Sequence, residues 1–229
     1  MLKHRSHTKE LLDQDNIPEA DLFQNLKELD TINFLLGGYT ISLSAFNSIL
    51  KKDTPQTLVD IGCGGGDTLK RIYSWSKKNH KNISLLGVDI KPVCIEYATN
   101  NTQGLPIQYI CDDYRHIFNH AEQIDVIHAC LFCHHLSEEQ LIELIQFSIK
   151  HKAILVVNEL ERNVLAYYSI KWLTKLFSNS YLVKNDAPLS VARGFKKKEW
   201  IAILQKSGAK HFSVKNKWAF RHQVIVYAD

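Results

Sequence analysis

The 229-residue sequence predicts a single α/β domain in which a mostly parallel sheet carries helices on both of its faces. Two observations lead to this fold class. From residue 57 onward, short apolar runs rich in β-branched residues alternate with helical segments, which is the pattern of consecutive βαβ units. These runs are also apolar on both faces, as the strands of a covered parallel sheet are. The length suits one large domain, and no linker interrupts it.

The N-terminal 50 residues are expected to form a helical cap. Leucines and an isoleucine recur at three- and four-residue intervals over residues 19–36, which is the spacing of an amphipathic helix. Gly37 and Gly38 follow this segment and favour the end of the helix.

The core is expected over residues 55–160. Its strands are expected at residues 57–61, 83–88, 107–111, 124–129 and 153–157, and its helices at residues 68–78, 92–100 and 137–150. Ser137 and Gln140 form a capping box, which predicts where the last of these helices begins.

The remaining chain adds an insertion and an edge. Residues 161–195 are rich in aromatic side chains and are expected to lie on the substrate side. Residues 196–229 are expected to form a helix at 197–206 and two edge strands at 211–217 and 223–227. The sequence therefore predicts seven strands.

The composition excludes several classes of protein. The net charge of +4 and the three lysines at 196–198 fall short of a nucleic-acid footprint. Five cysteines at irregular spacing do not indicate a disulfide framework. No apolar stretch approaches the roughly 20 residues of a membrane span, and the first residues carry no apolar signal segment. We therefore expect a cytoplasmic protein with reduced thiols and no nucleic-acid partner.

The sharpest feature is the run DIGCGGGDT at residues 60–68, where a strand leads into glycines and then into a helix. Glycines permit the sharp turn and let a ligand approach the backbone N–H groups. A dinucleotide site would have a sixth-position glycine and a phosphate at the helix N-terminus. This sequence has Asp67 there, whose carboxylate would repel a phosphate. With Asp60 at the strand end, the pattern indicates a phosphate-free, positively charged ligand, and S-adenosylmethionine fits that description.

Acidic residues also end the next two predicted strands. Asp89 follows the second strand, where a carboxylate can accept both hydrogen bonds of a ribose diol. Asp112 and Asp113 follow the third strand and can accept the amine of an adenine. Each acid alone could be a helix cap or part of a surface turn. Acids at three successive strand ends, after a glycine loop, favour a ligand site.

These motifs resemble those of class I S-adenosylmethionine-dependent methyltransferases, in particular the small-molecule branch that contains the quinone-biosynthesis enzymes. The resemblance is carried by residues 59–68, 87–90, 111–117 and 124–136. It implies a Rossmann-like seven-stranded sheet with an antiparallel final strand, and it implies S-adenosylmethionine as cofactor and S-adenosylhomocysteine as product. The methionine end would contact Asp60, Gly62, Gly64, Ala129 and Cys130, the ribose Asp89, and the adenine Ile90, Asp113 and Tyr114.

The full set of residues expected around the cofactor is Asp60, Gly62, Cys63, Gly64, Asp67, Asp89, Ile90, Asp112, Asp113, Tyr114, Ala129 and Cys130. Two further segments, residues 32–39 and 158–168, resemble methyltransferases that are encoded beside bacterial polyketide synthases.

The run CLFCHH at residues 130–135 contains a Cys-x-x-Cys-His motif. Haem attachment through this motif requires export, and a zinc site would need a second ligand pair, so no metal is expected. His134 or His135 is expected to face the substrate, where an imidazole could deprotonate a phenol or an acidic carbon. Both histidines could equally serve to stabilise the loop, because methyl transfer chiefly requires in-line alignment.

The insertion carries an apolar stripe at helical spacing over residues 167–177. Packing onto the core is the ordinary explanation, and a lid over an aromatic or lipid-like acceptor is the functional one. The residues expected on the substrate side are Tyr39, Arg162, Tyr167 and Tyr168. Lys171 and Lys175 lie beside the stripe and would suit contact with a membrane surface.

The sequence thus predicts methyl transfer to oxygen or carbon of a small aromatic, polyketide-like or lipid-like molecule. One alternative is a protein that binds S-adenosylmethionine without catalysis, since no residue is obligatory for the chemistry. Another is a nucleic-acid methyltransferase, which the missing base-methylation motifs and basic face disfavour. A dinucleotide oxidoreductase is disfavoured by Asp67.

Overall fold

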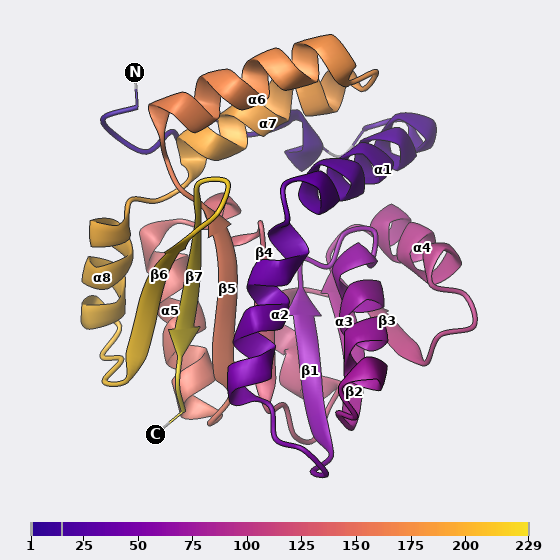
Figure 1. The fold of residues 1–229 in the computed structure, drawn as a ribbon, viewed down its shortest axis with the longest axis vertical. Helices are drawn as coiled ribbons and strands as arrows, with labels where there is room; N and C mark the ends of the chain where they lie inside the picture. Colours follow the sequence, from indigo (N-terminus) through magenta and orange to yellow (C-terminus); the bar gives the residue numbers. More distant parts are fainter. Residues whose placement is uncertain (1, 15, 229) are drawn as a thin grey trace.

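The computed structural model describes residues 2–14 and 16–228 and confirms the predicted fold class (Figure 1). Its strands form one seven-stranded sheet in the order β3-β2-β1-β4-β5-β7-β6. Strands β1 to β5 run parallel, whereas β7 pairs antiparallel with both β5 and β6. The strands are β1 (Gln56–Ile61), β2 (Ile83–Asp89), β3 (Ile107–Cys111), β4 (Val126–Cys130), β5 (Ile154–Leu160), β6 (Phe212–Lys217) and β7 (Arg221–Val226).

Eight α-helices accompany the sheet within the described residues. They are α1 (Glu19–Leu35), α2 (Gly38–Ile49), α3 (Asp67–Lys78), α4 (Pro92–Asn101), α5 (Glu138–Lys150), α6 (Val164–Phe177), α7 (Tyr181–Arg193) and α8 (Lys197–Lys206). Helix α5 begins where the capping box predicts, because the Ser137 hydroxyl accepts the N–H of Gln140. Gly37 ends α1 as expected, with a φ of +67° that glycine adopts readily.

Two helices have no periodic signal of their own in the sequence: α2, which lies within the expected helical cap, and α7. Helix α2 consists largely of β-branched, serine and aromatic residues, which are weak helix formers. It forms because Ala45 and Phe46 are buried against the sheet. Helix α7 contains Pro188, a residue that usually interrupts a helix. In both cases tertiary packing overrides the local preference.

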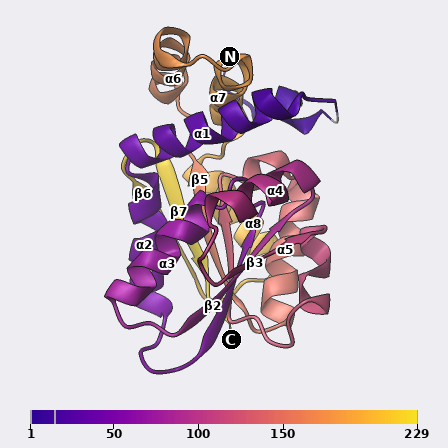
Figure 2. The same ribbon diagram turned by 90° about the vertical axis from the view of Figure 1, so that its right-hand side faces the viewer.

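The strands divide the core into two layers, because successive side chains of a strand point to opposite faces. Val59 and Ile61 contribute to the layer that α5 and α8 cover. Leu58 contributes to the opposite layer, which α2 and α3 cover. Figure 2 shows the sheet between these helices. The burial of both faces explains why the strands read as continuous apolar runs.

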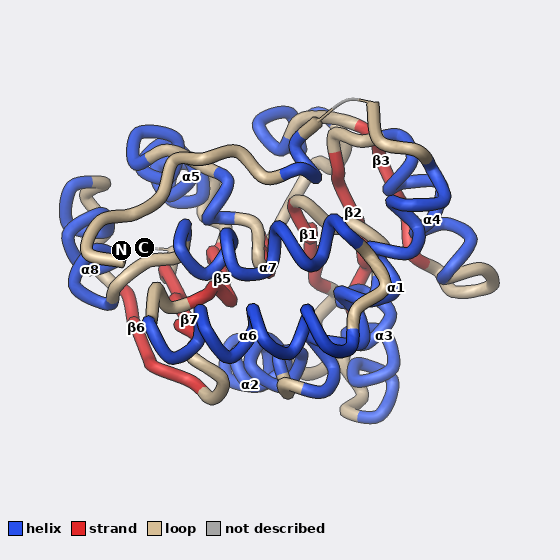
Figure 3. The backbone as a smooth tube through the Cα atoms, turned by 90° about the horizontal axis from the view of Figure 1, so that it is seen from above, coloured by secondary structure: helices blue, strands red, loops and turns tan. Residues whose placement is uncertain are grey.

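A third group of helices lies over one edge of the sheet. Helices α1, α6 and α7 cross above the carboxyl ends of the parallel strands, with α6 and α7 side by side (Figures 1 and 3). Helix α1 also contacts α7 and the start of α2. This roof encloses the region where ligands of parallel α/β sheets bind. Among the helices of residues 2–14 and 16–228, none has the combined length and hydropathy that crossing a bilayer requires.

Candidate functional site

Two adjoining cavities lie between the carboxyl edge of the sheet and the helical roof. The first cavity has a volume of about 410 Å³ and lies at the ends of β1, β2, β3 and β4. All but two of the residues expected around the cofactor line it. These are Gly62, Cys63, Gly64, Asp67, Asp89, Ile90, Asp112, Asp113, Tyr114 and Cys130.

The glycine loop forms the floor of the first cavity. Gly62, Gly64 and Gly66 all have positive φ angles, a conformation that side chains with a Cβ strongly disfavour. A Cβ at Gly62 would also overlap the ring of Phe132, so that position requires glycine for steric reasons too. Helix α3 begins directly after this loop, at Asp67. The loop therefore presents bare backbone to the cavity.

Asp89 braces this loop from the end of β2. Its two carboxylate oxygens each accept a backbone N–H at 3.0 Å, one from Gly64 and one from Lys91. Burial raises the pKa of Asp89 despite these two hydrogen bonds. Each oxygen keeps a further lone pair, so the carboxylate can still accept hydrogen bonds from a ligand in the cavity.

The end of β3 supplies the opposite wall. Hydrogen bonds from His120 and His116 hold the pKa of Asp112 well below its ordinary value. Asp113 accepts both the backbone and the guanidinium N–H groups of Arg115, which lower its pKa. These two carboxylates are therefore ionised at neutral pH.

Aromatic and aliphatic side chains complete that wall. The ring of Tyr114 lies edge-on to Phe132 with centroids 5.5 Å apart, and Ile90 is 67% exposed at the rim. Both line the first cavity, as the adenine assignment requires. A flat ring system between such side chains would be held by apolar contact on its faces.

Carboxylates dominate the charge of the first cavity. Burial and the neighbouring charge of Asp30 raise the pKa of Asp67 to about 6. Asp13 and Asp30 join the wall from the N-terminal cap, whereas the basic side chains are Lys91 and Arg115. This charge balance suits a ligand with cationic groups and no phosphate, as S-adenosylmethionine is. The residues present therefore fit that cofactor.

Two of the expected cofactor contacts are not in the cavity wall, which corrects the sequence-based placement. The Asp60 carboxylate lies 2.7 Å from Nδ1 of His128, whose Nε2 lies 2.9 Å from the hydroxyl of Ser42. All three side chains are buried, so Asp60 serves a hydrogen-bond chain between β1, β4 and α2. Ala129 is fully buried in the layer under α5. The alternation of side chains along a strand explains both placements.

The second cavity has a volume of about 580 Å³ and lies under α6 and α7. Its wall is mainly aliphatic and comes from α1, α6, α7 and the turn between β6 and β7. The side chains that represent these elements are Ile32, Leu36, Ala166, Ile170, Leu173, Val183, Val191 and Trp218. Leu12, Leu29, Leu131 and His135 line both cavities, so they form a shared wall.

His134 and His135 lie beside this shared wall, each held by a carboxylate. Nδ1 of His134 lies 2.9 Å from Glu159, and Nδ1 of His135 lies 3.0 Å from Asp13. Although burial opposes it, hydrogen bonds from His135 and Arg193 hold the pKa of Asp13 well below its ordinary value. An ionised Asp13 can only accept a hydrogen bond, so Nδ1 of His135 is the donor in this pair.

Glu10 is the third member of this cluster. Its carboxylate oxygens lie 3.5 Å from Nε2 of His134 and 3.9 Å from Nε2 of His135. Burial raises the pKa of Glu10 to about 7. The three side chains are close enough to share a metal ion. However, the Arg193 guanidinium lies 3.9 Å from the Glu10 carboxylate and opposes a cation there, so a proton-handling network describes the cluster better.

The residues expected on the substrate side are placed differently from one another. Tyr39 lines the first cavity and donates a hydrogen bond to Asp30 at 2.6 Å. Arg162 is fully buried and lines neither cavity, because its guanidinium binds the carbonyl of Gly194 and the carboxylate of Glu199.

Tyr167 and Tyr168 also lie outside both cavity walls. Their rings contact each other edge-on, and Tyr168 is exposed on the outer side of α6. The side of α6 that lines the second cavity carries Ala166 and Ile170 instead. The helical period explains this, since the two tyrosines lie roughly 100° and 200° around the helix from Ala166.

Several lining residues could not be identified from the sequence. Leu26, Leu29, Asp30 and Asn33 reach the first cavity from α1, whose predicted amphipathic face accounts for the leucines but not for their ligand-facing position. Glu10 and Asp13 lie in a segment without a periodic signal. Only the path of the chain over the sheet brings them to the site.

Comparison with known proteins agrees with this geometry. Residues 58–150 match the family model described as "Methyltransferase domain". Among curated proteins, carboxy-S-adenosyl-L-methionine synthase of Helicobacter pylori strain J99 is similar to this chain. The two are 24% identical over 195 residues, which span 80% of this chain and 79% of the relative.

Solved structures share the fold at low sequence identity. The plantazolicin methyltransferase BpumL, in complex with a monoazolic desmethylPZN analog and SAH, aligns with a TM-score of 0.65 at 18% identity, over 92% of this chain and 89% of that one. Human N-acetylserotonin methyltransferase in complex with SAM aligns with a TM-score of 0.63 at 14% identity, over 92% and 56%. Residues 58–150 thus match a methyltransferase domain, and the chain shares its fold with solved methyltransferases that were crystallised with SAH or SAM.

Proposed function

We propose that this enzyme methylates an oxygen or carbon of a small apolar acceptor, an aromatic or polyketide-like molecule with a lipid-like portion. The observation that carries this proposal is the second cavity, an aliphatic space of about 580 Å³ that shares a wall with the first. A guest in each cavity would meet at Leu29, Leu131 and His135. Direct contact between two guests is what group transfer requires.

The first cavity holds the cofactor in this proposal. Asp89 binds the ribose hydroxyls, Asp113 faces the adenine amine, and Asp67 with the glycine loop faces the cationic amino-acid end. When bound, the cofactor supplies a methyl group on a positively charged sulfur and leaves as neutral S-adenosylhomocysteine. The carboxylates lower the free energy of the cation relative to neutral ligands.

His135 takes the proton that the acceptor loses. Its Nδ1 is bonded to Asp13, so Nε2 is the atom that accepts this proton. Its side chain lines both cavities, which supports a position beside the reacting atoms. The positive charge that the imidazole gains with this proton would be compensated by the carboxylates of Asp13 and Glu10. Asp13 acts as a positioning residue, since it fixes the ring orientation.

The acceptor carries an apolar portion because the part of the second cavity under α6 and α7 is lined by aliphatic side chains. Burying an unpaired charge among Ile170, Leu173 and Val183 would cost several kcal/mol. The solved relatives favour a small acceptor, because their names describe methyltransferases of plantazolicin and of N-acetylserotonin.

The test uses methyl-labelled S-adenosylmethionine and a series of phenols that carry alkyl chains of increasing length. We expect transfer to the phenol, with kcat/KM that rises as the chain lengthens, because each added CH₂ buried contributes about 0.8 kcal/mol. Transfer that is indifferent to chain length would contradict the assignment of the second cavity.

The curated relative motivates one competing function, synthesis of carboxy-S-adenosyl-L-methionine. Mass spectrometry of the same reactions distinguishes it. A carboxylated cofactor without methylated acceptor, formed when candidate carboxylate donors are added, would replace the present proposal.

A further inference from the structure

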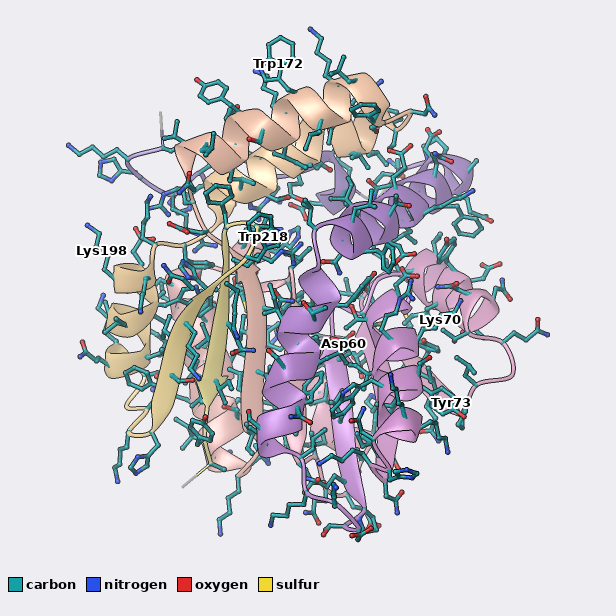
Figure 4. The ribbon with its side chains drawn as sticks, viewed as in Figure 1. Asp60, Lys70, Tyr73, Trp172, Lys198 and Trp218 are labelled. Carbon is teal, nitrogen blue, oxygen red and sulfur yellow. The ribbon has the colours of Figure 1, made fainter. Side chains whose placement is uncertain are left out.

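The outer side of α6 is apolar although it faces away from the protein. Figure 4 shows Trp172 at the top of the molecule, directed away from the sheet. Trp172 is 59% exposed and Leu176 is 68% exposed, and Leu165 and Tyr168 are exposed on the same side. Thr174 is the one buried residue of α6. We call the surface formed by Leu165, Tyr168, Trp172 and Leu176 the outer face of α6.

The inner side of the same helix is also apolar, because Ala166, Ile170 and Leu173 line the second cavity. A helix that is apolar on both sides is expected in a buried position, not at the outermost edge of a protein. Helix α6 lies at that edge in two perpendicular views (Figures 1 and 2). The outer face therefore lacks a covering layer among the described residues.

The charged side chains of α6 itself are all of one sign. Lys171 and Lys175 lie along its border, one helical turn apart, and Lys184 follows in α7. Residues 163–185 contain no aspartate or glutamate. The ammonium groups of Lys171 and Lys175 lie over the rings of Tyr167 and Trp172, at 6.0 and 5.4 Å from the ring centroids.

We propose that the outer face of α6 docks on an anionic lipid bilayer, with the helix lying in the plane of the membrane interface. Tryptophan and tyrosine prefer the headgroup level, and lysines that border an apolar helix face bind anionic headgroups. A second copy of this chain is a poorer occupant, because a two-fold contact through α6 would bring Lys171 and Lys175 against their own copies.

The position of the second cavity suggests what membrane docking would do for the enzyme. Leu173 lines the cavity and is 44% exposed, so the cavity reaches the surface at the border of α6. A lipid-like acceptor could pass from the bilayer to the cavity without crossing water. The docking itself rests on the outer face and not on the identity of the acceptor.

Vesicle flotation with the full chain tests the proposal. The probes are vesicles of phosphatidylcholine alone and of phosphatidylcholine with phosphatidylglycerol, without cofactor or acceptor. We expect flotation with the anionic vesicles, at least tenfold more than with the neutral ones, and release at high salt. The double variant Trp172→Ser/Leu176→Ser should lose at least tenfold in partitioning, and Lys171→Glu/Lys175→Glu should lose the preference for anionic lipid.

The matched control is Tyr227→Ser, which removes a 38% exposed aromatic directly after β7. In Figure 1 the C-terminal end of β7 lies at the end of the sheet opposite α6. Its flotation should equal that of the unchanged chain. Binding of S-adenosylhomocysteine reports whether each variant is folded.

Three results would overturn the proposal. They are no flotation of the unchanged chain with anionic vesicles, equal flotation of the Trp172→Ser/Leu176→Ser variant, and a dimer that this variant dissociates while vesicle binding is absent. None of these measurements depends on methyl transfer, so the docking and the proposed reaction stand or fall separately.

Discussion

The first cavity is walled by strand ends and carboxylates, whereas the second is walled by helices and aliphatic side chains. The polar residues of the first cavity that follow β1, β2 and β3 lie at the carboxyl edge of the sheet, where the parallel strands end. The second cavity depends on how α1, α6 and α7 cross over the sheet. The difference shows that the strand-end side of the first cavity follows from the fold of the core, whereas the second cavity follows from the helical roof.

The largest effect is expected from a substitution in the wall that the two cavities share. His135→Gln should lower kcat for methyl transfer by roughly 10²- to 10⁴-fold, the usual contribution of a general base. Binding of S-adenosylhomocysteine should change little, because the variant keeps the volume of the side chain. Single-turnover kinetics with an alkylphenol acceptor and calorimetry provide the two readouts. Turnover equal to that of the unchanged enzyme would show that alignment alone suffices.

Asp13→Asn offers a milder test of the same residue pair. An amide cannot hold the imidazole in the same orientation with the same charge, so we expect a loss of about tenfold in kcat and a displaced pH profile. A loss of stability without any change in the profile would mean that Asp13 only supports the fold.

Asp89→Ala should weaken the binding of S-adenosylhomocysteine by about 10²-fold or more, because two charge-assisted hydrogen bonds contribute roughly 1.5–3 kcal/mol each. The second cavity should be unaffected, since Asp89 does not line it. Calorimetry measures the dissociation constant. Unchanged affinity would remove the ribose assignment.

Ala166→Phe is the reciprocal variant, because it fills the second cavity from α6. We expect KM for a long-chain alkylphenol to rise by about tenfold, in line with an overpacking cost of 1–3 kcal/mol. Affinity for S-adenosylhomocysteine should remain as it is. A parallel loss in both measurements would mean that the two cavities are not independent.

The smallest effect concerns pH. The pKa of Asp67 is raised to about 6 by burial and by Asp30. A bound cation favours the ionised carboxylate and lowers this pKa in the complex, so the complex binds fewer protons than the free enzyme. Affinity for S-adenosylmethionine should therefore rise severalfold from pH 5 to pH 7 and level off above. Asp67→Asn should flatten the curve, and calorimetry across that range checks it.

The contrast between the cavities also marks what the sequence could predict. The strand-end acids and glycines were identifiable because the carboxyl ends of parallel strands meet at one edge. The capping box at Ser137 gave the start of α5 in the same local way. Asp60 was misplaced because its carboxylate serves a buried network with His128, a partner 68 residues away.

The roof shows where local patterns stop being informative. The apolar stripe of residues 167–177 indicated a helix but not which side would face the cavity, and the structure turns Tyr167 and Tyr168 away from it. Glu10 and Asp13 meet His134 and His135 across more than 120 residues of chain. Such meetings depend on long-range packing, which leaves no periodic trace in the sequence.

The shared wall has a kinetic consequence. Ile90 lies at the rim of the first cavity, and Leu173 and Trp218 lie at exposed positions of the second. A cofactor and an acceptor that enter through separate openings need not bind or leave in a fixed order. S-adenosylhomocysteine could be exchanged for S-adenosylmethionine while the acceptor stays bound. An acceptor with two reactive positions could then be methylated twice before it dissociates.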